Sequence, residues 1–281
     1  MRPGPPLGPR AAGQPAVSGT VVSPRPCHRV IVAVPARDEQ ATIADTLASI
    51  DRAATRVPAP VTISLAADSC GDDTVRVARE VPLRRARLVV VEGVWGRAGA
   101  ARAAAVAHAL HRLDRHAACW IANTDADCRV PVDWLEIQLR YGRVAAAVAG
   151  VVALDPATTP ADLLLAFHRT YHVDGDRHHH VHGANLGVWA DAYAAAGGWC
   201  PRTVVGEDHA LWDAVRAGGF AVTQTASLTV VTSARTRGRV HGGFATNLFR
   251  LDDPSPAPAG RHHVADAVAV RADSLAATPA A

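Results

Sequence analysis

Apolar runs and polar loops alternate through the first half of the chain. The segments 30–34, 61–67, 87–91 and 119–122 are short and mainly apolar, and each is followed by a polar loop. Runs of this length between turn residues are typical of buried strands. The longer segments between them have helical spacing. This alternation predicts a β-α-β-α-β-α-β unit, which builds a parallel sheet with right-handed crossovers.

The predicted helices and the second half follow from the same reasoning. In the second half the pattern is less regular, and no internal repeat is found. Helices are expected over 40–54, from 73 or 74, and over 100–113, 134–143, 163–171 and 207–217, with further strands over 145–154 and 183–189.

Composition supports an α/β protein and argues against several other classes. Of the 281 residues, 49% are hydrophobic and only 5% aromatic, a mix that suits alanine-rich helices on a sheet. The formal charge of +3 is too small, and the basic residues are too scattered, for a nucleic-acid-binding protein. The longest apolar stretch, 145–154, is too short to cross a bilayer, so no transmembrane segment is expected.

The two ends of the chain differ from its centre. Residues 1–26 and 254–281 are rich in Pro, Gly and Ala, so we expect a disordered leader and a disordered tail around a fold at 27–253. The leader lacks the layout of a signal peptide. Five cysteines form no CxxC pair and leave one odd, which favours reduced thiols and a cytoplasmic location, either free or peripheral to the membrane.

Polar loops follow all four strands predicted in the first half. They span 35–39, 68–73, 93–102 and 123–127, and the carboxyl ends of such strands form the edge where ligands bind. The last loop contains Asp125 and Asp127, whose spacing lets both carboxylates reach one hard cation that can hold a diphosphate. An isolated Asp-x-Asp is more often a turn or a cap. The order and spacing of the four loops together therefore carry the argument.

Together these segments resemble family 2 glycosyltransferases of the GT-A fold. The resemblance covers about 30–250, in the family order, and is carried by VIVAVPARDE, SLAADSCGDDT, GRAGAARAAAVAHA, NTDAD, HGANLGVW, GGW and GEDHALWDAVRAGG. It implies an α/β, GT-A nucleotide-diphospho-sugar transferase fold, with a mostly parallel central sheet and helices on both faces. It further implies a nucleotide-binding half at 27–130 and an acceptor half at 131–253.

The resemblance also implies an activity. It points to a hexosyltransferase that uses Mg²⁺ or Mn²⁺ and a UDP-, GDP- or dTDP-linked sugar donor. The acceptor would be a small or a lipid-linked molecule. Neither the base, the sugar nor the acceptor follows from the motifs.

The donor side of the site is implied by matching positions. The first loop would line the nucleoside pocket, and Asp68 would accept a hydrogen bond from the base. Arg97 and Arg102 would approach the diphosphate or the donor sugar, because a planar guanidinium can bind two oxygens. A solvated helix face is the alternative for Arg102. The donor-binding positions are Pro35, Ala36, Arg37, Glu39, Asp68, Arg97, Arg102, Thr124, Asp125 and Asp127.

The metal and catalytic positions are carried over in the same way. The resemblance implies that Asp127 binds the cation and that Asp125, a second candidate ligand, touches the ribose or the donor sugar. Asp208 and Glu207 are the implied catalytic positions, and Asp208 matches the base that takes a proton from the acceptor hydroxyl in an inverting transfer. On its own, this Glu-Asp pair would be interpreted as a helix cap. The acceptor-side positions are Gly183, Ala184 and Asn185.

Two further stretches leave alternatives open. Six histidines between 168 and 182 allow an acceptor-binding loop, a solvated loop or, without recognisable ligand spacing, a zinc site. The basic segment 233–244 resembles a loop that closes over the diphosphate in GT-A enzymes, including glucosyl-3-phosphoglycerate synthases. In those retaining relatives a histidine joins the metal, which makes His241 a candidate ligand.

The sequence also departs from the family pattern and leaves competing functions. The family often has arginine or glutamine shortly after the Glu-Asp pair, whereas this chain continues His209-Ala-Leu-Trp212. It lacks the membrane helices of processive members, so polymer extrusion is not expected. A retaining enzyme and a non-catalytic sugar-nucleotide-binding module remain alternatives. A nucleotidyltransferase or a hydride-transferring enzyme is disfavoured, because the first loop lacks their glycine-rich motifs.

Overall fold

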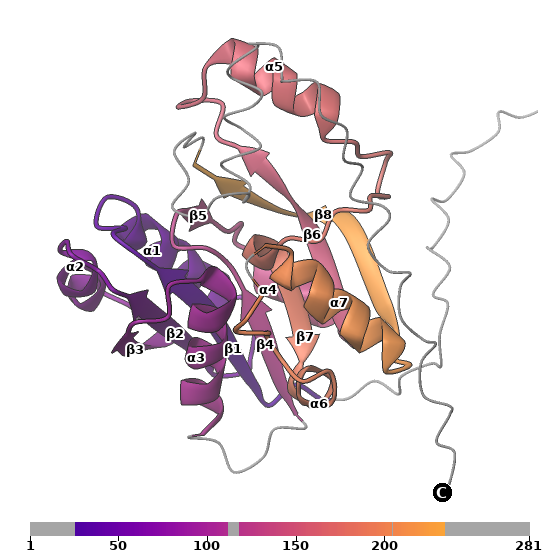
Figure 1. The fold of residues 1–281 in the computed structure, drawn as a ribbon, viewed down its shortest axis with the longest axis horizontal. Helices are drawn as coiled ribbons and strands as arrows, with labels where there is room; N and C mark the ends of the chain where they lie inside the picture. Colours follow the sequence, from indigo (N-terminus) through magenta and orange to yellow (C-terminus); the bar gives the residue numbers. More distant parts are fainter. Residues whose placement is uncertain (1–25, 112–117, 204, 234–281) are drawn as a thin grey trace, which may run out of the picture.

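The computed structural model describes residues 26–111, 118–203 and 205–233. They form one sheet flanked by helices, with the strand order β3-β2-β1-β4-β7-β6-β8-β5 (Figure 1). The strands are β1 (Arg29–Ala36), β2 (Val61–Asp68), β3 (Ala86–Gly93), β4 (Cys119–Asn123), β5 (Cys128–Arg129), β6 (Ala147–Leu154), β7 (Leu186–Trp189) and β8 (Val222–Thr232). The helices are α1 (Ile43–Ala54), α2 (Thr74–Glu80), α3 (Ala98–Leu110), α4 (Trp134–Tyr141), α5 (Ala161–Thr170), α6 (Ala190–Ala195) and α7 (Glu207–Ala217).

The first four strands along the chain form the parallel unit that the periodicity predicts. β1 pairs in parallel with β2 and β4, and β2 pairs in parallel with β3. Residues 30–34 are at most 1% exposed, as expected for a strand with helices on both faces. Right-handed crossovers place α1 and α2 on one face, and α3, which returns across β1 to β4, on the other. The order therefore reverses between β1 and β4, the place where ligands bind in such sheets.

The second half of the sheet is mixed. β7 runs antiparallel to β4 and to β6, β8 runs parallel to β6, and β5 runs antiparallel to β8. The predicted mostly parallel arrangement thus describes the first half better than the second. The sequence patterns did not predict β8, because its apolar residues are interspersed with Thr, Gln and Ser and form no continuous run. The two-residue β5 and the short α6 were also not predicted.

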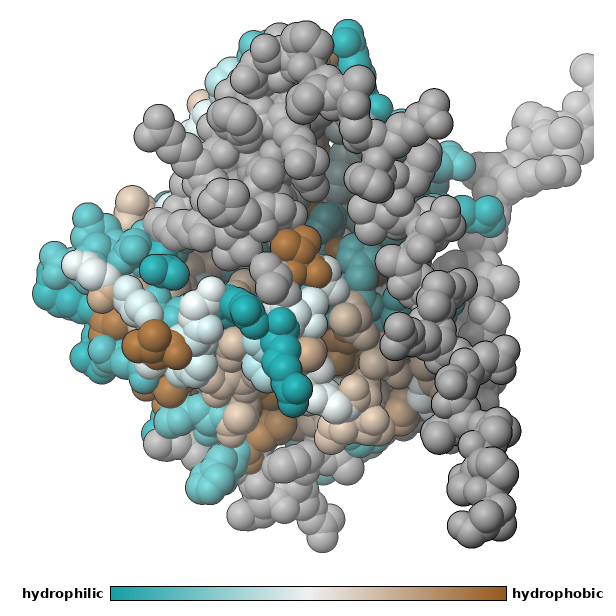
Figure 2. Space-filling view, in the orientation of Figure 1, coloured by the Kyte–Doolittle hydropathy of each residue, from teal (hydrophilic) through white to brown (hydrophobic). Residues whose placement is uncertain are grey.

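Two apolar clusters hold the described residues together. The main one surrounds the sheet and contains five buried tryptophans, Trp120, Trp134, Trp189, Trp199 and Trp212. A small one, of Leu154, Leu163 and Phe167, fixes α5, which lies at the end of the structure remote from α2 and β3 (Figure 1). Where the described residues form the surface of the view in Figure 2, apolar residues are scattered. None of the described helices combines the length and apolar character needed to cross a bilayer.

Two buried asparagines link neighbouring elements of the fold through side-chain hydrogen bonds. Asn123, at the end of β4, donates to the Leu186 carbonyl at 3.0 Å. Asn185 donates to the carbonyls of Val151 (2.8 Å) and Leu228 (2.9 Å) and accepts from the Trp134 indole (2.9 Å). Both asparagines are 0% exposed. The structure therefore buries Asn185 as a brace between strands instead of presenting its side chain to an acceptor.

Candidate functional site

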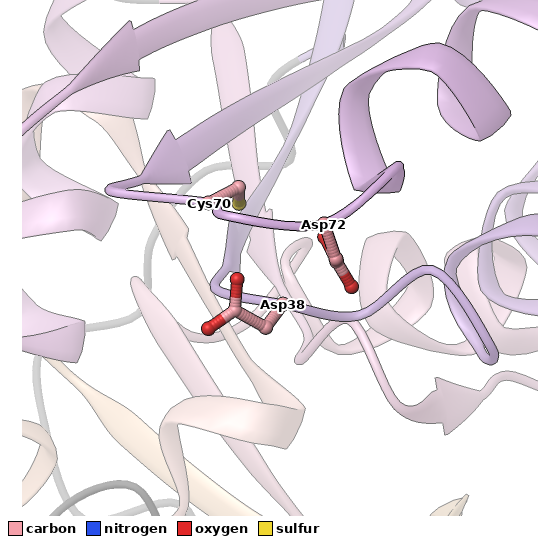
Figure 3. A group of neighbouring side chains, drawn as sticks. All are labelled: Asp38, Cys70 and Asp72. Carbon is pink, nitrogen blue, oxygen red and sulfur yellow. The ribbon is translucent and has the colours of Figure 1, made fainter.

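The loops after β1 and β2 are joined by carboxylates. Asp38 accepts from the Gly71 N–H at 2.7 Å, and Asp72 accepts from the Gln40 N–H at 3.0 Å. Figure 3 shows Asp38 and Asp72 reaching from the two loops toward one region, with Cys70 beside them. Ligand atoms of these three residues lie within 4.8 Å of one another. Because each carboxylate accepts a hydrogen bond from a backbone N–H of the other loop, Asp38 and Asp72 hold the two loops together.

The residues expected around the nucleoside differ in exposure. Arg37 is exposed and Pro35 is partly exposed, whereas Ala36 is buried. Glu39 is 8% exposed, and its carboxylate accepts from the Thr42 hydroxyl at 2.9 Å. Of the expected nucleoside-pocket residues, Pro35 and Arg37 are therefore the ones whose side chains a ligand can reach.

Asp68 ends β2 and organises the loop that follows β3. Its Oδ1 accepts from the N–H groups of Trp95 (2.7 Å) and Gly96 (3.1 Å) and from the Ser69 hydroxyl (3.2 Å). Gly96 has a φ of +68°, a conformation that favours glycine. Among the described residues, no donor bonds to Oδ2 of Asp68. One carboxylate oxygen thus holds the loop, and the other retains its capacity to accept a hydrogen bond.

Arg97 and Arg102, both expected near the diphosphate, bind protein groups. Arg97 donates to the carbonyls of Arg202 (2.9 Å) and Pro201 (3.5 Å), in the loop between α6 and α7. Arg102 is only 3% exposed, so the solvated-helix alternative for this residue is wrong.

The Arg102 guanidinium lies at the centre of the site. It donates through Nη1 to Glu207 at 3.0 Å and through Nη2 to Asp125, and its Cζ lies 5.2 Å from the Trp199 ring centroid. Two glycines leave room for this group. A Cβ on Gly183 would lie 2.5 Å from Arg102 Cζ, and a Cβ on Gly99 would lie 2.9 Å from Glu207 Cγ.

The Asp-x-Asp pair has the donor set of a hard-cation site. Ligand atoms of Asp125, Asp127 and Cys128 lie within 4.8 Å of one another. Burial raises the pKa of the Cys128 thiol well above its usual value, which leaves the carboxylates as donors, and carboxylate oxygens suit Mg²⁺ or Mn²⁺. Asp127 also accepts from the Ser233 hydroxyl at 2.9 Å. Thr124, expected to contact the donor, is 0% exposed, and its hydroxyl has no hydrogen-bond partner in the described part of the chain.

Burial also affects Asp125 itself. It raises the pKa of the Asp125 carboxyl, the nearby Arg102 opposes this change, and the Asp127 charge adds to it, leaving the pKa raised overall. A second positive charge beside Asp125 and Asp127 would relieve this cost. The pair therefore fits a divalent cation on electrostatic grounds as well as by donor type.

Asp208 lies in the first turn of α7, as predicted. Its Oδ2 accepts from the Gly183 N–H at 3.1 Å, and its Oδ1 accepts from the backbone N–H of His209 at 2.8 Å. Burial acts to raise the pKa of Asp208, but the hydrogen bonds from His209 and the charge of Arg102 outweigh it, so the pKa is lowered. Ala184, which follows Gly183, is 8% exposed.

Histidines of the 168–182 segment form an ordered stack. The Tyr171 ring lies 3.7 Å from the His180 ring centroid at an interplanar angle of 6°, and its hydroxyl is 2.9 Å from His182 Nε2. His178 stacks on His180 and is 5% exposed. The solvated-loop alternative therefore fails for these residues. Within the described ranges, no group of three potential metal ligands includes a histidine, so the zinc alternative gains no support.

Some expected features cannot be placed, and others were missed. His241, most of the 233–244 segment, nearly all of the leader and all of the tail lie outside the described residues. The GGW motif at 197–199 was part of the resemblance, but no role was predicted for its Trp199, the ring of which Arg102 covers. His209 was treated only as a departure from the family pattern.

Comparison with known proteins identifies the family. The model of glycosyl transferase family 2 matches residues 31–191, more than half of the chain. The solved structures that this fold resembles include the mannosyltransferase PcManGT from Pyrobaculum calidifontis in complex with GDP-Man and Mn²⁺ (TM-score 0.56, 17% identity, 80% of this chain and 62% of that chain). They also include S. aureus TarS 1–349 in complex with UDP-GlcNAc (TM-score 0.55, 10% identity, 79% of this chain and 64% of that chain).

These likenesses concern the fold and extend over part of each neighbour. The chain spans less than two thirds of the length of both solved chains. A search among curated proteins found no match. The family and the fold expected from the motifs are nevertheless confirmed: the chain belongs to glycosyl transferase family 2.

Proposed function

We propose that this protein is a metal-dependent glycosyltransferase, which moves a sugar from a nucleotide-diphosphate donor to an acceptor hydroxyl with inversion. The observation that carries the proposal is the contact series from Asp125 through Arg102 to Glu207, the neighbour of Asp208. It brings an acidic pair suited to a cation and a carboxylate suited to a general base to one edge of the sheet. The nucleotide sugars in the structures of the two solved neighbours support a donor of this class.

The donor would lie along the loops that follow β1, β2 and β3. Asp68 would recognise the base through Oδ2, because Oδ1 is used by the loop backbone. Uracil, guanine and thymine each have an N–H group that a fixed carboxylate can accept, so UDP-, GDP- and dTDP-linked sugars are all candidates.

Asp127, with Asp125, would hold Mg²⁺ or Mn²⁺. A bound divalent cation would neutralise charge on the leaving diphosphate. Asp125 is already bonded to Arg102, so Asp127 is the stronger candidate for the main protein ligand. His241 stays a candidate third ligand.

Asp208 would remove the proton from the acceptor hydroxyl as its oxygen attacks the anomeric carbon. The lowered pKa of Asp208 keeps its carboxylate ionised at neutral pH, the form that a base requires. The Gly183 N–H would hold one carboxylate oxygen in place. The acceptor would be a small or lipid-linked molecule, bound in the cytoplasm or at the membrane surface.

A thermal-shift panel of UDP, GDP, dTDP and their sugars, with and without Mn²⁺, tests the donor class. Binding to the native state alone raises apparent stability by mass action, so the cognate nucleotide should give the largest shift, and only with metal. The matching sugar nucleotide should then release free nucleoside diphosphate when acceptors are added. No stabilisation by any member of the panel would count against a nucleotide-sugar enzyme.

The Asp208→Asn variant tests the chemistry. Asparagine keeps the size and capping ability of aspartate but not its basicity. Transfer should fall by about 10²–10⁴-fold, the usual worth of a general base, while nucleotide binding stays unchanged. NMR of the first-formed product should show inverted anomeric configuration. Retained configuration with a near-normal rate in the variant would instead favour a retaining enzyme.

A further inference from the structure

His209 lies directly against the candidate base. Its Nδ1 is 3.1 Å from Oδ1 of Asp208, the same oxygen that accepts the His209 backbone N–H. The His209 side chain is 59% exposed, whereas that of Asp208 is 20% exposed. The imidazole therefore links a mostly buried carboxylate to solvent.

Other charged and titratable groups face this pair from three parts of the fold. On α7, Glu207 and Asp213 act on His209 in addition to Asp208. His180 and His182 face it from the segment before β7, and Arg102 of α3 acts on Asp208.

These surroundings separate the titration of His209 from that of its neighbours. The hydrogen bond to Asp208 raises the pKa of His209, against the opposing effect of burial, and nearby carboxylates raise it further. Burial lowers the pKa of His180 and lowers that of His182 to about 4. Of these three histidines, only His209 is thus expected to titrate above the ordinary value of about 6.5.

We propose that His209 is a positioning residue that orients Asp208 through Nδ1 and sets the pH at which Asp208 acts as a base. As an imidazolium, His209 donates a charge-assisted hydrogen bond from Nδ1–H to Oδ1. This bond stabilises the Asp208 anion, which makes the carboxylate a weaker proton acceptor. As a neutral ring it still donates to Oδ1 through Nδ1–H, but it no longer depresses the basicity of Asp208. The inference builds on the proposed role of Asp208.

The test is a pH profile of kcat/KM for the wild type, two His209 variants and one control variant. In the wild type the rate should rise with pH along a limb centred above about 6.5. His209→Asn retains an N–H donor near the Nδ1 position but does not titrate, so this limb should vanish while the plateau rate survives. His209→Ala should lose the limb and also about tenfold in kcat, the order of one charge-assisted hydrogen bond, with donor KM unchanged. His111→Gln, an exposed histidine after α3, is the control.

Two results would overturn the inference. One is a wild-type profile without this limb, and the other is a limb that persists in both variants. An NMR titration of the His209 ring keeps this test separate from the proposed activity. Its pKa should lie above about 6.5 in the wild type and fall toward that value in Asp208→Asn, even if no sugar transfer is detected. A ring that titrates identically in both proteins would show that the pair is not coupled.

Discussion

Arg102 and Glu207 form a buried ion pair of 3.0 Å between α3 and α7. They are separated by 105 residues in sequence, and the second arm of the same guanidinium binds Asp125 at the end of β4. The Arg102 side chain is 4% exposed and that of Glu207 is 15% exposed. One cation thus joins the proposed donor and acceptor sides of the site.

Replacing Arg102 should therefore damage stability as well as activity. Arg102→Met keeps much of the apolar volume but leaves two partly buried carboxylates without their cation, at a cost on the order of 3–5 kcal/mol. Urea unfolding measures this change in the free energy of unfolding. Arg76→Met is the matched control, because Arg76 also pairs with two carboxylates but its side chain is 58% exposed. Equal, small decreases in the free energy of unfolding of the two variants would mean that the buried ion pairs stabilise the protein no more than exposed ones do.

The Asp68→Asn variant should distinguish the two roles of Asp68, which are holding the loop after β3 and binding the base. Asp68→Asn keeps a carbonyl oxygen for the N–H groups of Trp95 and Gly96, so the loop should persist. Its amide presents N–H in place of Oδ2, which would repel the N–H of a base. Nucleotide affinity by calorimetry should weaken by about 1.5–3 kcal/mol, the range for a hydrogen bond to a charged group. Unchanged affinity would restrict Asp68 to holding the loop.

The metal assignment predicts a loss confined to metal-dependent binding. Wild-type protein should bind its nucleoside diphosphate more tightly with Mn²⁺ than without it, and Asp127→Ala should remove that difference. Calorimetry with and without Mn²⁺ measures both values. Asp45→Ala, an exposed acidic residue in the first turn of α1, controls for the loss of one negative charge. If wild-type binding is equally strong without metal, the Asp127 assignment fails.

Acid should destabilise the protein through His182. Burial lowers its pKa to about 4, so between pH of about 6.5 and 4 the unfolded chain binds a proton that the folded chain does not. His182 therefore costs no stability above about pH 6.5. As the pH falls below this value, the free energy of unfolding decreases, by about 2–3 kcal/mol at pH 4.5. His182→Gln keeps a partner for Tyr171 and should flatten this dependence in urea unfolding at pH 7 and 4.5. His179→Gln, an exposed neighbour, should retain the wild-type slope.

The parallel half of the fold was predictable mainly because β1, β2 and β4 are buried on both faces. Residues 30–34 and 119–122 are continuous apolar runs for that reason, and the polar loops after them mark the ligand edge. The same argument does not reach β8, where buried and partly exposed positions mix Val with Thr and Gln. The direction of β7 was likewise not encoded in any local pattern, because it depends on which neighbour the strand meets.

The site was predictable as a set of positions but not as a set of contacts. Asp68, Asp125 and Asp208 follow recognisable motifs, yet the partners of Arg102 lie 23 and 105 residues away from it in sequence. No periodicity relates residues so far apart. For Asn185 the prediction failed in the opposite way. This polar motif residue was expected to face the acceptor, but it is buried, and its side chain bonds to β6, β8 and α4.

The antiparallel pairing of β4 with β7 also limits how the protein can be divided. A fragment ending near residue 130 would contain every strand of the parallel unit, yet the outer edge of β4 would lose its partner, and β5 would lose β8. The exposed row of backbone N–H and C=O groups on β4 would then invite pairing with another chain. Separately expressed halves should consequently aggregate unless they are mixed during refolding, so the proposed nucleotide-binding half is not expected to fold independently.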